Sequence, residues 1–151
     1  MAVVHHSAIC VHDLDASLRF WRDGLGFEVL MDEKFHGDWP TLLRAQSSSL
    51  RAVFLGQTTS PDAGILELVE FGPTSAGSPS PTPGVAGFLL LSVMIDVEAT
   101  LARLAALNLG GDIRRIEVGG VVVCTVVDPD GVVVELMDTG AAANLDRLRQ
   151  S

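Results

Sequence analysis

The chain has 151 residues, and its 10 Lys and Arg residues against 19 Asp and Glu residues give a formal net charge of -9 at pH 7. This length favours one compact domain, or two small halves that share a core, and leaves no room for a separate substrate domain. The acidic balance argues against nucleic acid and anionic membranes as partners, because both require clustered Lys and Arg. Hydrophobic residues make up 48% of the chain, which is ample for a folded core.

The apolar stretches of the chain are short. The longest ones, such as 88–91 and 121–124, fall far below the ~20 residues of a membrane-spanning helix. The first residues lack the basic start and the long apolar run of a signal peptide, so we expect a cytoplasmic protein. Cys10 and Cys124 both stand in apolar, strand-like runs, which favours two reduced and buried thiols over a disulfide.

The two halves of the chain share one pattern, which begins with a strand and a helix. Residues 3–11 and 87–95 are strand-like, and each run is followed by an aspartate suited to cap a helix, Asp13 or Asp96. The two aspartates are 83 residues apart. An apolar stripe with helical spacing follows each cap, formed by Leu14, Leu18 and Trp21 in the first half and by Val97, Leu101 and Leu104 in the second.

Three β-rich runs follow each predicted helix, at 27–31, 50–55 and 65–71 in the first half and at 112–118, 121–127 and 132–137 in the second. Each half is therefore predicted to be a β-α-β-β-β module, which gives an α+β fold with modules over 1–71 and 87–138. The Pro-rich segment 72–86 is predicted to be a linker, and residues 141–151 a terminal helix.

Two carboxylates stand in the middle of apolar runs. Glu67 lies within 65–69 and Glu135 within 132–137, and both runs are apolar on each face, as expected where helices cover one face of a sheet and a cavity lies against the other. A buried, unpaired carboxylate is costly, so such a pair requires a proton, a base or a metal ion. An equally open alternative is that one or both carboxylates lie at a strand end, where water or an arginine compensates the charge.

Four segments resemble the vicinal oxygen chelate superfamily, namely 4–15, 20–27, 65–71 and 128–137. This superfamily includes glyoxalase I, methylmalonyl-CoA epimerase, extradiol dioxygenases, fosfomycin-modifying enzymes and bleomycin-resistance proteins. The resemblance implies two βαβββ modules that form a cupped mixed sheet around a small-molecule substrate or ligand, commonly completed by a homodimer. It is less specific for function, because the superfamily hosts several reactions and some pure binders.

The resemblance also implies a divalent metal ion, held by one residue from the first strand and one from the last strand of each module. These positions fall on His6, Glu67 and Glu135, and alignment of the two aspartate caps puts the fourth, usually His, at Leu89. As an apolar residue at that position, Leu89 is a candidate substrate contact. Three ligands can still hold Ni, Zn, Mn, Co or Fe, with water or substrate in the open positions. We favour a metal, because a metal-free binder has little reason to keep three inward polar groups. His5 would point to the opposite face of a regular strand.

The segment 33–49 is predicted to be a long loop that shapes the substrate pocket. Trp39 is a candidate for stacking on a ligand, and anchoring of its own loop is the alternative. His36 could reach over the cavity, and Arg44 and Arg51 could hold an anionic substrate group, although a solvated surface position is the more common outcome for such histidines and arginines.

Two functions follow from this site. The first is a metal-dependent lyase or isomerase that works through an enediolate or enolate, with Glu135 or Glu67 as the base. The alternative is a metal-free antibiotic-binding protein of the bleomycin-resistance kind, favoured by the acidic charge and by Leu89. An extradiol dioxygenase is less favoured, because its iron site requires a second histidine.

Overall fold

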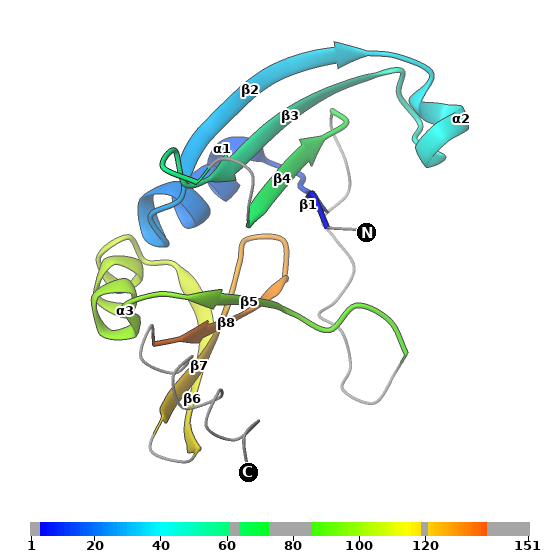
Figure 1. Ribbon diagram of the computed structural model, residues 1–151. Helices are drawn as coiled ribbons and strands as arrows, with labels where there is room; N and C mark the ends of the chain where they lie inside the picture. The colour runs from blue at the N-terminus through cyan, green and yellow to red at the C-terminus, as the bar shows by residue number, and fades with distance from the viewer. Residues whose placement is uncertain (1–3, 61–63, 73–85, 119–120, 139–151) are drawn as a thin grey trace. The chain divides into compact units, whose positions relative to one another are not determined.

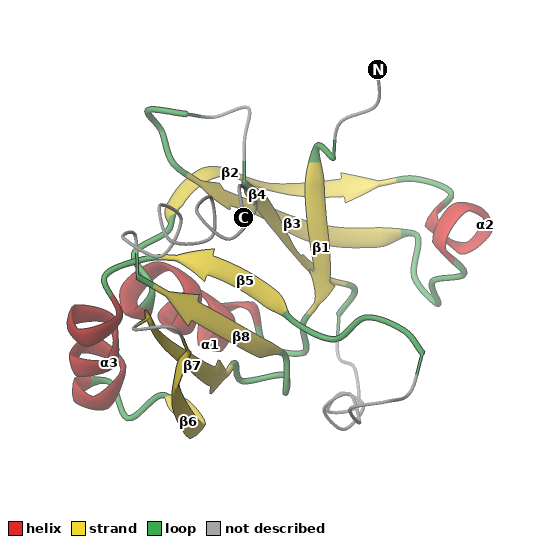
Figure 2. Cartoon of the chain, turned by 60° about the horizontal axis from the view of Figure 1, so that its bottom comes forward, coloured by secondary structure: helices red, strands yellow, loops and turns green. Residues whose placement is uncertain are grey.

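Residues 4–60, 64–72, 86–118 and 121–138 are described by the computed structural model, and they form two four-stranded sheets with helices beside them (Figures 1 and 2). The chain divides into two units, Met1–Gly77 and Ser78–Ser151. Most of the predicted linker and the whole predicted terminal helix lie outside the described residues. None of the described helices combines the length and the apolar character needed to cross a membrane.

The first module has the strand order β1-β4-β3-β2. Strand β1 pairs in parallel with β4, and the other two pairs are antiparallel. The helical segment α1, with the π-helical turn η1 after it, supplies the crossover that precedes the antiparallel strands. The elements are β1 (His6–Cys10), α1 (Leu14–Leu18), η1 (Arg19–Gly24), β2 (Glu28–His36), α2 (Trp39–Leu43), β3 (Ser49–Gly56) and β4 (Ile65–Glu70).

The second module repeats this topology with the order β5-β8-β7-β6, again with one parallel pair, β5 with β8. The predicted α+β fold of two β-α-β-β-β modules is therefore confirmed, with α2 as an addition to the first module. The elements are β5 (Leu91–Met94), α3 (Val97–Ala106), β6 (Gly110–Val118), β7 (Val121–Val127) and β8 (Val133–Met137).

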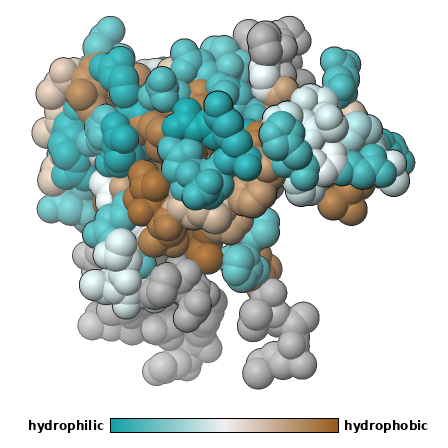
Figure 3. Space-filling view, turned by 90° about the horizontal axis from the view of Figure 1, so that it is seen from above, coloured by the Kyte–Doolittle hydropathy of each residue, from teal (hydrophilic) through white to brown (hydrophobic). Residues whose placement is uncertain are grey.

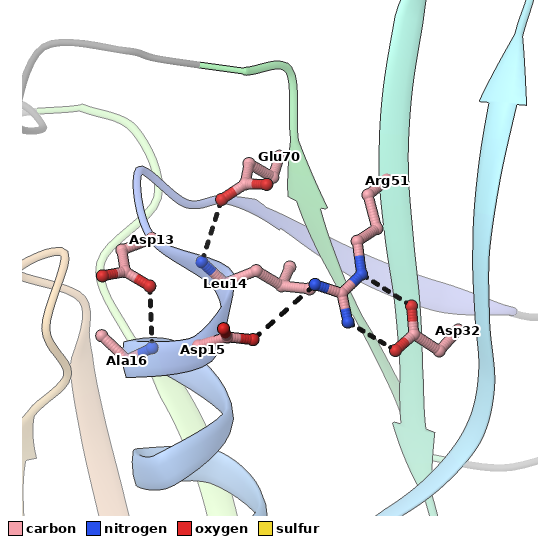
Figure 4. Close-up of polar contacts among 7 residues, drawn as sticks. All are labelled: Asp13, Leu14, Asp15, Ala16, Asp32, Arg51 and Glu70. Atoms are coloured by element: carbon pink, nitrogen blue, oxygen red, sulfur yellow. Dashed lines mark hydrogen bonds and ion pairs between the residues drawn. The ribbon is translucent and has the colours of Figure 1, made fainter.

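Each module begins its helix with two carboxylates. An aspartate caps the helix by accepting a backbone N–H three residues later, and a second carboxylate, at or just after the end of the module's last strand, accepts the first N–H of the helix. Negative charge at this end also interacts favourably with the helix dipole. The bonds are Ala16 N to Asp13 (3.0 Å) and Leu14 N to Glu70 (3.1 Å) in the first module (Figure 4), and Ala99 N to Asp96 (2.9 Å) and Val97 N to Asp138 (3.4 Å) in the second.

The predicted helix stripes pack into the cores of the two modules. Their buried members are Leu14, Leu18 and Trp21 in the first module and Val97 and Leu104 in the second, whereas Leu101 is half-buried. Alternate residues of the central strands, among them Val53, Leu55 and Leu68, are also fully buried. Burial of one such side chain stabilises the fold by about 1.5–3 kcal/mol.

Two local predictions are wrong. Strand β2 continues to His36 and is followed by the short helix α2, so the expected loop over 33–49 is largely structured. The charged residues of β2 are compatible with a strand because β2 is an exposed edge of the sheet. Cys10 is exposed and not buried, because β1 is also an edge strand and Cys10 alternates with the buried Ile9 and Val11, whereas Cys124 is buried as expected.

Candidate functional site

The first module brings His6 and Glu67 together. Ala8 of β1 lies opposite Glu67 of β4, and His6, two residues before Ala8, lies on the same face of the sheet. His6 Nε2 is 3.2 Å from Glu67 Oε2, and their side chains are 36% and 17% exposed. An imidazole and a carboxylate therefore meet at a partly buried position on the sheet.

Two neighbours hold the His6 ring, and neither was identified as such from the sequence. Phe54 lies opposite Glu67 on β3, and its ring centroid is 5.3 Å from that of His6. His5 Nδ1 is 2.8 Å from His6 Nδ1. The expectation that His5 points away from His6 is wrong, because β1 begins at His6 and the alternation of a strand does not extend to His5. The Phe54 contact depends on the register between β3 and β4, which the sequence does not specify.

In the second module, Glu135 is held by a serine. Ser92 lies opposite Glu135 in the parallel pair of β5 and β8, and its hydroxyl donates to Glu135 Oε2 at 2.7 Å. Ser92 was not predicted to belong to the site. Its equivalence to Ala8 of the first module follows from the strand pairing and not from the sequence alone.

Strand pairing also corrects the position equivalent to His6. Since Ala8 pairs with Glu67 as Ser92 pairs with Glu135, the equivalent of His6 is Leu90, one residue beyond the predicted Leu89. Leu89 is 53% exposed, whereas Leu90 is half-buried and directly precedes β5.

The one-residue error comes from the turn between strand and helix. Val11 N donates to the last strand of its module as Ile95 N does in the second, so these two residues are equivalent. His12 then separates Val11 from the cap Asp13, whereas Asp96 follows Ile95 directly. Counting back from each cap to the strand therefore gives Leu89, one residue too early, as the equivalent of His6.

The His6–Glu67 pair has a spacing suited to one divalent ion. Two ligand atoms about 2.1 Å from a common ion lie about 3.0 Å apart in octahedral and about 3.4 Å apart in tetrahedral geometry. The observed 3.2 Å between Nε2 and Oε2 falls within this interval. The described residues contain no group of three His, Cys, Asp or Glu that could by itself hold a metal ion, so the pair alone is a partial site.

Arg51 faces away from this pair. It lies opposite Glu70, three residues after Glu67 and hence on the other face of the sheet. Its guanidinium donates to both carboxylate oxygens of Asp32, at 2.8 and 2.6 Å, and lies 3.7 Å from Asp15 (Figure 4). The hydrogen bond from Arg51 lowers the pKa of Asp32. Arg51 therefore joins strands β2 and β3 of the sheet.

A hollow of about 470 Å³ lies near Arg51 and not at the His6–Glu67 pair. Its lining includes Lys34, Ser49, Arg51 and Glu70. Lys34 and Ser49 share the face of Arg51, because Lys34 lies opposite Arg51 and Ser49 is two residues from it. The hollow mixes both signs of charge, and we assign the candidate chemistry to the His6–Glu67 pair, where the donor atoms converge.

Trp39 anchors its own segment. Its side chain packs on the cluster of Leu50, Ala52 and Val69, and its buried Nε1 has no hydrogen-bond partner in the described part of the chain. Gly37 leaves room for the indole, because a Cβ there would lie 3.1 Å from Trp39 Cε2.

The other predicted pocket residues are solvent-exposed. His36 ends β2, and Arg44 ends α2 with a φ of 57°. Leu42 and Leu43 of α2 are exposed as well. On the face of the molecule drawn in Figure 3, hydrophobic residues are grouped among hydrophilic ones.

Comparisons with known proteins agree with this architecture. Residues 3–136 match the family model of the Glyoxalase/Bleomycin resistance protein/Dioxygenase superfamily. The chain is 37% identical over 148 residues to the lactoylglutathione lyase-like protein terB of Aspergillus terreus. This alignment covers 89% of this chain and 74% of that protein.

Solved structures share the fold at lower identity. A glyoxalase family protein from Bacillus cereus superposes with a TM-score of 0.71 at 16% identity, covering 91% of this chain and 94% of its own. The trypanothione-dependent glyoxalase I of Leishmania major superposes with a TM-score of 0.66 at 24% identity, and the match covers 100% of both chains. TnmS3, an antibiotic binding protein from Streptomyces sp. CB03234, superposes with a TM-score of 0.52 at 19% identity, and the match covers 91% of this chain and 96% of TnmS3. The chain belongs to the Glyoxalase/Bleomycin resistance protein/Dioxygenase superfamily.

Proposed function

We propose that the protein is a metal-dependent lyase or isomerase of the glyoxalase type, acting on a small substrate with two neighbouring oxygens through an enolate or enediolate. The observation that supports this most directly is the His6–Glu67 pair, with Nε2 and Oε2 3.2 Å apart on adjacent strands. The relative from Aspergillus terreus, described as lactoylglutathione lyase-like, supports the same reaction class.

His6 and Glu67 would hold the divalent ion together with Glu135, the corresponding residue of the second module. One imidazole and two carboxylates form a donor set for a hard or borderline ion, so Ni, Zn, Mn, Co and Fe are the candidates. When bound, such an ion acts as a Lewis acid on two vicinal substrate oxygens and stabilises the negative charge that develops there.

Glu135 is our first candidate for the base. The Ser92 hydroxyl engages Oε2, which fixes the carboxylate and leaves Oε1 as the oxygen that would take a proton from the substrate carbon. Glu67 is the second candidate, and its contact with His6 favours a ligand role for it instead. The Phe54 ring would shield one side of the His6 ring from water.

We propose a substrate contact at the position of the second module that is equivalent to His6. Strand pairing puts this position at Leu90 in place of Leu89. We also propose a homodimer, as commonly found in this superfamily. Sedimentation at micromolar concentration tests that part, and a monomer would refute it.

Exchange of a substrate proton tests the reaction class. In D2O, the Co-loaded protein should exchange the α-protons of hydroxyacetone or a longer α-hydroxyketone, as followed by proton NMR. The exchange should disappear with EDTA and in Glu135→Gln, whereas Glu33→Gln, which changes an exposed carboxylate of β2, should keep it. Equal exchange in Glu135→Gln and in the parent protein would refute the role of Glu135.

A metal-free binder is the second candidate function. It is favoured by the apolar Leu90 at the position equivalent to His6, and the fold is shared with the antibiotic binding protein TnmS3. Under this alternative, cationic antibiotics raise the melting temperature and divalent ions leave it unchanged, whereas the metal-dependent enzyme gives the opposite result.

A further inference from the structure

The His5 ring contacts the side of the His6 ring that faces away from Glu67. The two Nδ1 atoms are 2.8 Å apart, and the rings meet edge to face, with centroids 5.1 Å apart and planes at 85°. His6 Nε2, on the other side of its ring, is the atom near Glu67. The imidazole that we propose as a metal ligand thus contacts a second imidazole through its remaining nitrogen.

A bond between two neutral imidazole nitrogens has one donor and one acceptor. If His6 Nδ1 carries the hydrogen and donates, then Nε2 is unprotonated and can bind a cation. If His5 donates, the hydrogen of His6 lies on Nε2, near the Glu67 carboxylate. The negative charge of that carboxylate favours the second arrangement without a cation, and a cation beside Nε2 favours the first.

We propose that His5 is a positioning residue that stabilises either tautomer of His6, donating to His6 Nδ1 in the metal-free protein and accepting from it when a divalent cation binds Nε2. This inference rests on the proposed function for its metal-bound half. The hydrogens balance in this exchange: one leaves His6 Nε2, another is gained by His5 Nε2, and the shared hydrogen moves from His5 to His6.

The exchange of roles requires a side chain at position 5 that can both donate and accept. Neutral imidazole can do so, and so can a carboxamide after rotation. In metal sites a ligand histidine almost always donates its second N–H to a carboxylate, a backbone carbonyl or a water, and loss of that partner typically costs 10- to 100-fold in metal affinity. In this chain the partner is another histidine, and its neighbour Val4 is apolar and 83% exposed.

Metal affinity provides the first test. Titration of the metal-free full chain with Co2+, followed by calorimetry at pH 8.5, should give about tenfold weaker binding for His5→Ala than for the parent protein. His5→Gln should restore most of the affinity, and Val4→Ala is the matched control that should leave it unchanged. Equal affinity in His5→Ala and the parent, or failure of His5→Gln to restore binding, would overturn the proposal.

Nitrogen-15 NMR of labelled histidines provides the second test, because it reports the tautomer directly. At pH 8.5 the metal-free protein should show His6 protonated at Nε2, and Zn2+ should move the proton to Nδ1. His5→Ala should weaken this preference in the metal-free protein, because only the Glu67 carboxylate then favours the hydrogen on His6 Nε2. A metal-free His6 with an equal mixture of tautomers in the parent would overturn the inference without affecting the proposed function. A parent protein that binds no metal would refute the proposed function and the metal-bound half together.

Discussion

Leu90→His would complete the proposed set of four ligand positions, and it tests both the proposed metal site and the register correction. The pairing of Ala8 with Glu67 and of Ser92 with Glu135 makes Leu90 the equivalent of His6. An imidazole at position 90 should therefore occupy in the second module the place that His6 has in the first. Leu89→His is the matched control, because it adds the same side chain one residue earlier, at a 53% exposed position.

The size of the effect follows from the energy of a metal–ligand bond. A structural zinc with four protein ligands binds with about 10–16 kcal/mol, which is about 3 kcal/mol per ligand. At about 1.4 kcal/mol per factor of ten, a well-placed fourth ligand should increase affinity about 100-fold. Leu90 is only half-buried, so loss of its apolar burial should cost no more than about 1 kcal/mol of folding stability.

Competition with a chromogenic chelator measures the affinity of parent and variants for Zn2+ and Co2+ at one pH. We expect Leu90→His to bind at least tenfold more tightly than the parent, and Leu89→His to bind like the parent. Equal binding by both variants would refute the equivalence of Leu90 and His6. Tighter binding by Leu89→His alone would show that the spacing between the caps, and not the strand register, relates the two modules.

Three further predictions concern the fold. Asp96→Ala should lower the free energy of unfolding by about 1 kcal/mol, because it leaves the Ala99 N–H without its acceptor, and a loss below 0.3 kcal/mol in urea unfolding would contradict the cap. Asp32→Asn should cost about 0.5 kcal/mol at pH 7, discounted for solvent screening. Because Arg51 lowers the pKa of Asp32, this cost should be present in full well above 3.8, the ordinary pKa of the group, and should be lost as the pH falls below 3.8 and through the lowered pKa; an undiminished cost in acid below that pKa would refute the assignment. A thiol reagent should modify Cys10 in the folded protein and Cys124 only after unfolding, since burial raises the pKa of the Cys124 thiol, and mass spectrometry of the labelled peptides would reveal the reverse order.

The sequence predicted the two modules well, because their signals are local. The caps Asp13 and Asp96 and the apolar stripes after them define the helices, and the β-rich run around Glu67 predicted the strand that holds it. The extension of β2 to His36 was missed because its charged residues are stabilised by pairing with β3, a contact that is not local.

The site was harder to predict, because it depends on register. His6 and Glu67 followed from the family resemblance, but Ser92, Phe54 and Leu90 could be identified only once the strand pairing was known. The inserted His12 shifted the predicted fourth position by one residue. A change of one residue in register moves a side chain to the other face of a sheet, which is why the error mattered.

The central claim is that one divalent ion is held by His6, Glu67 and Glu135. Native mass spectrometry of the metal-free chain with one equivalent of Co2+ per chain tests it most directly. The account predicts one bound ion per chain in the parent protein, and loss of that ion in Glu67→Gln and equally in Glu135→Gln. An ion retained in Glu135→Gln, or no ion bound by the parent protein, would contradict it.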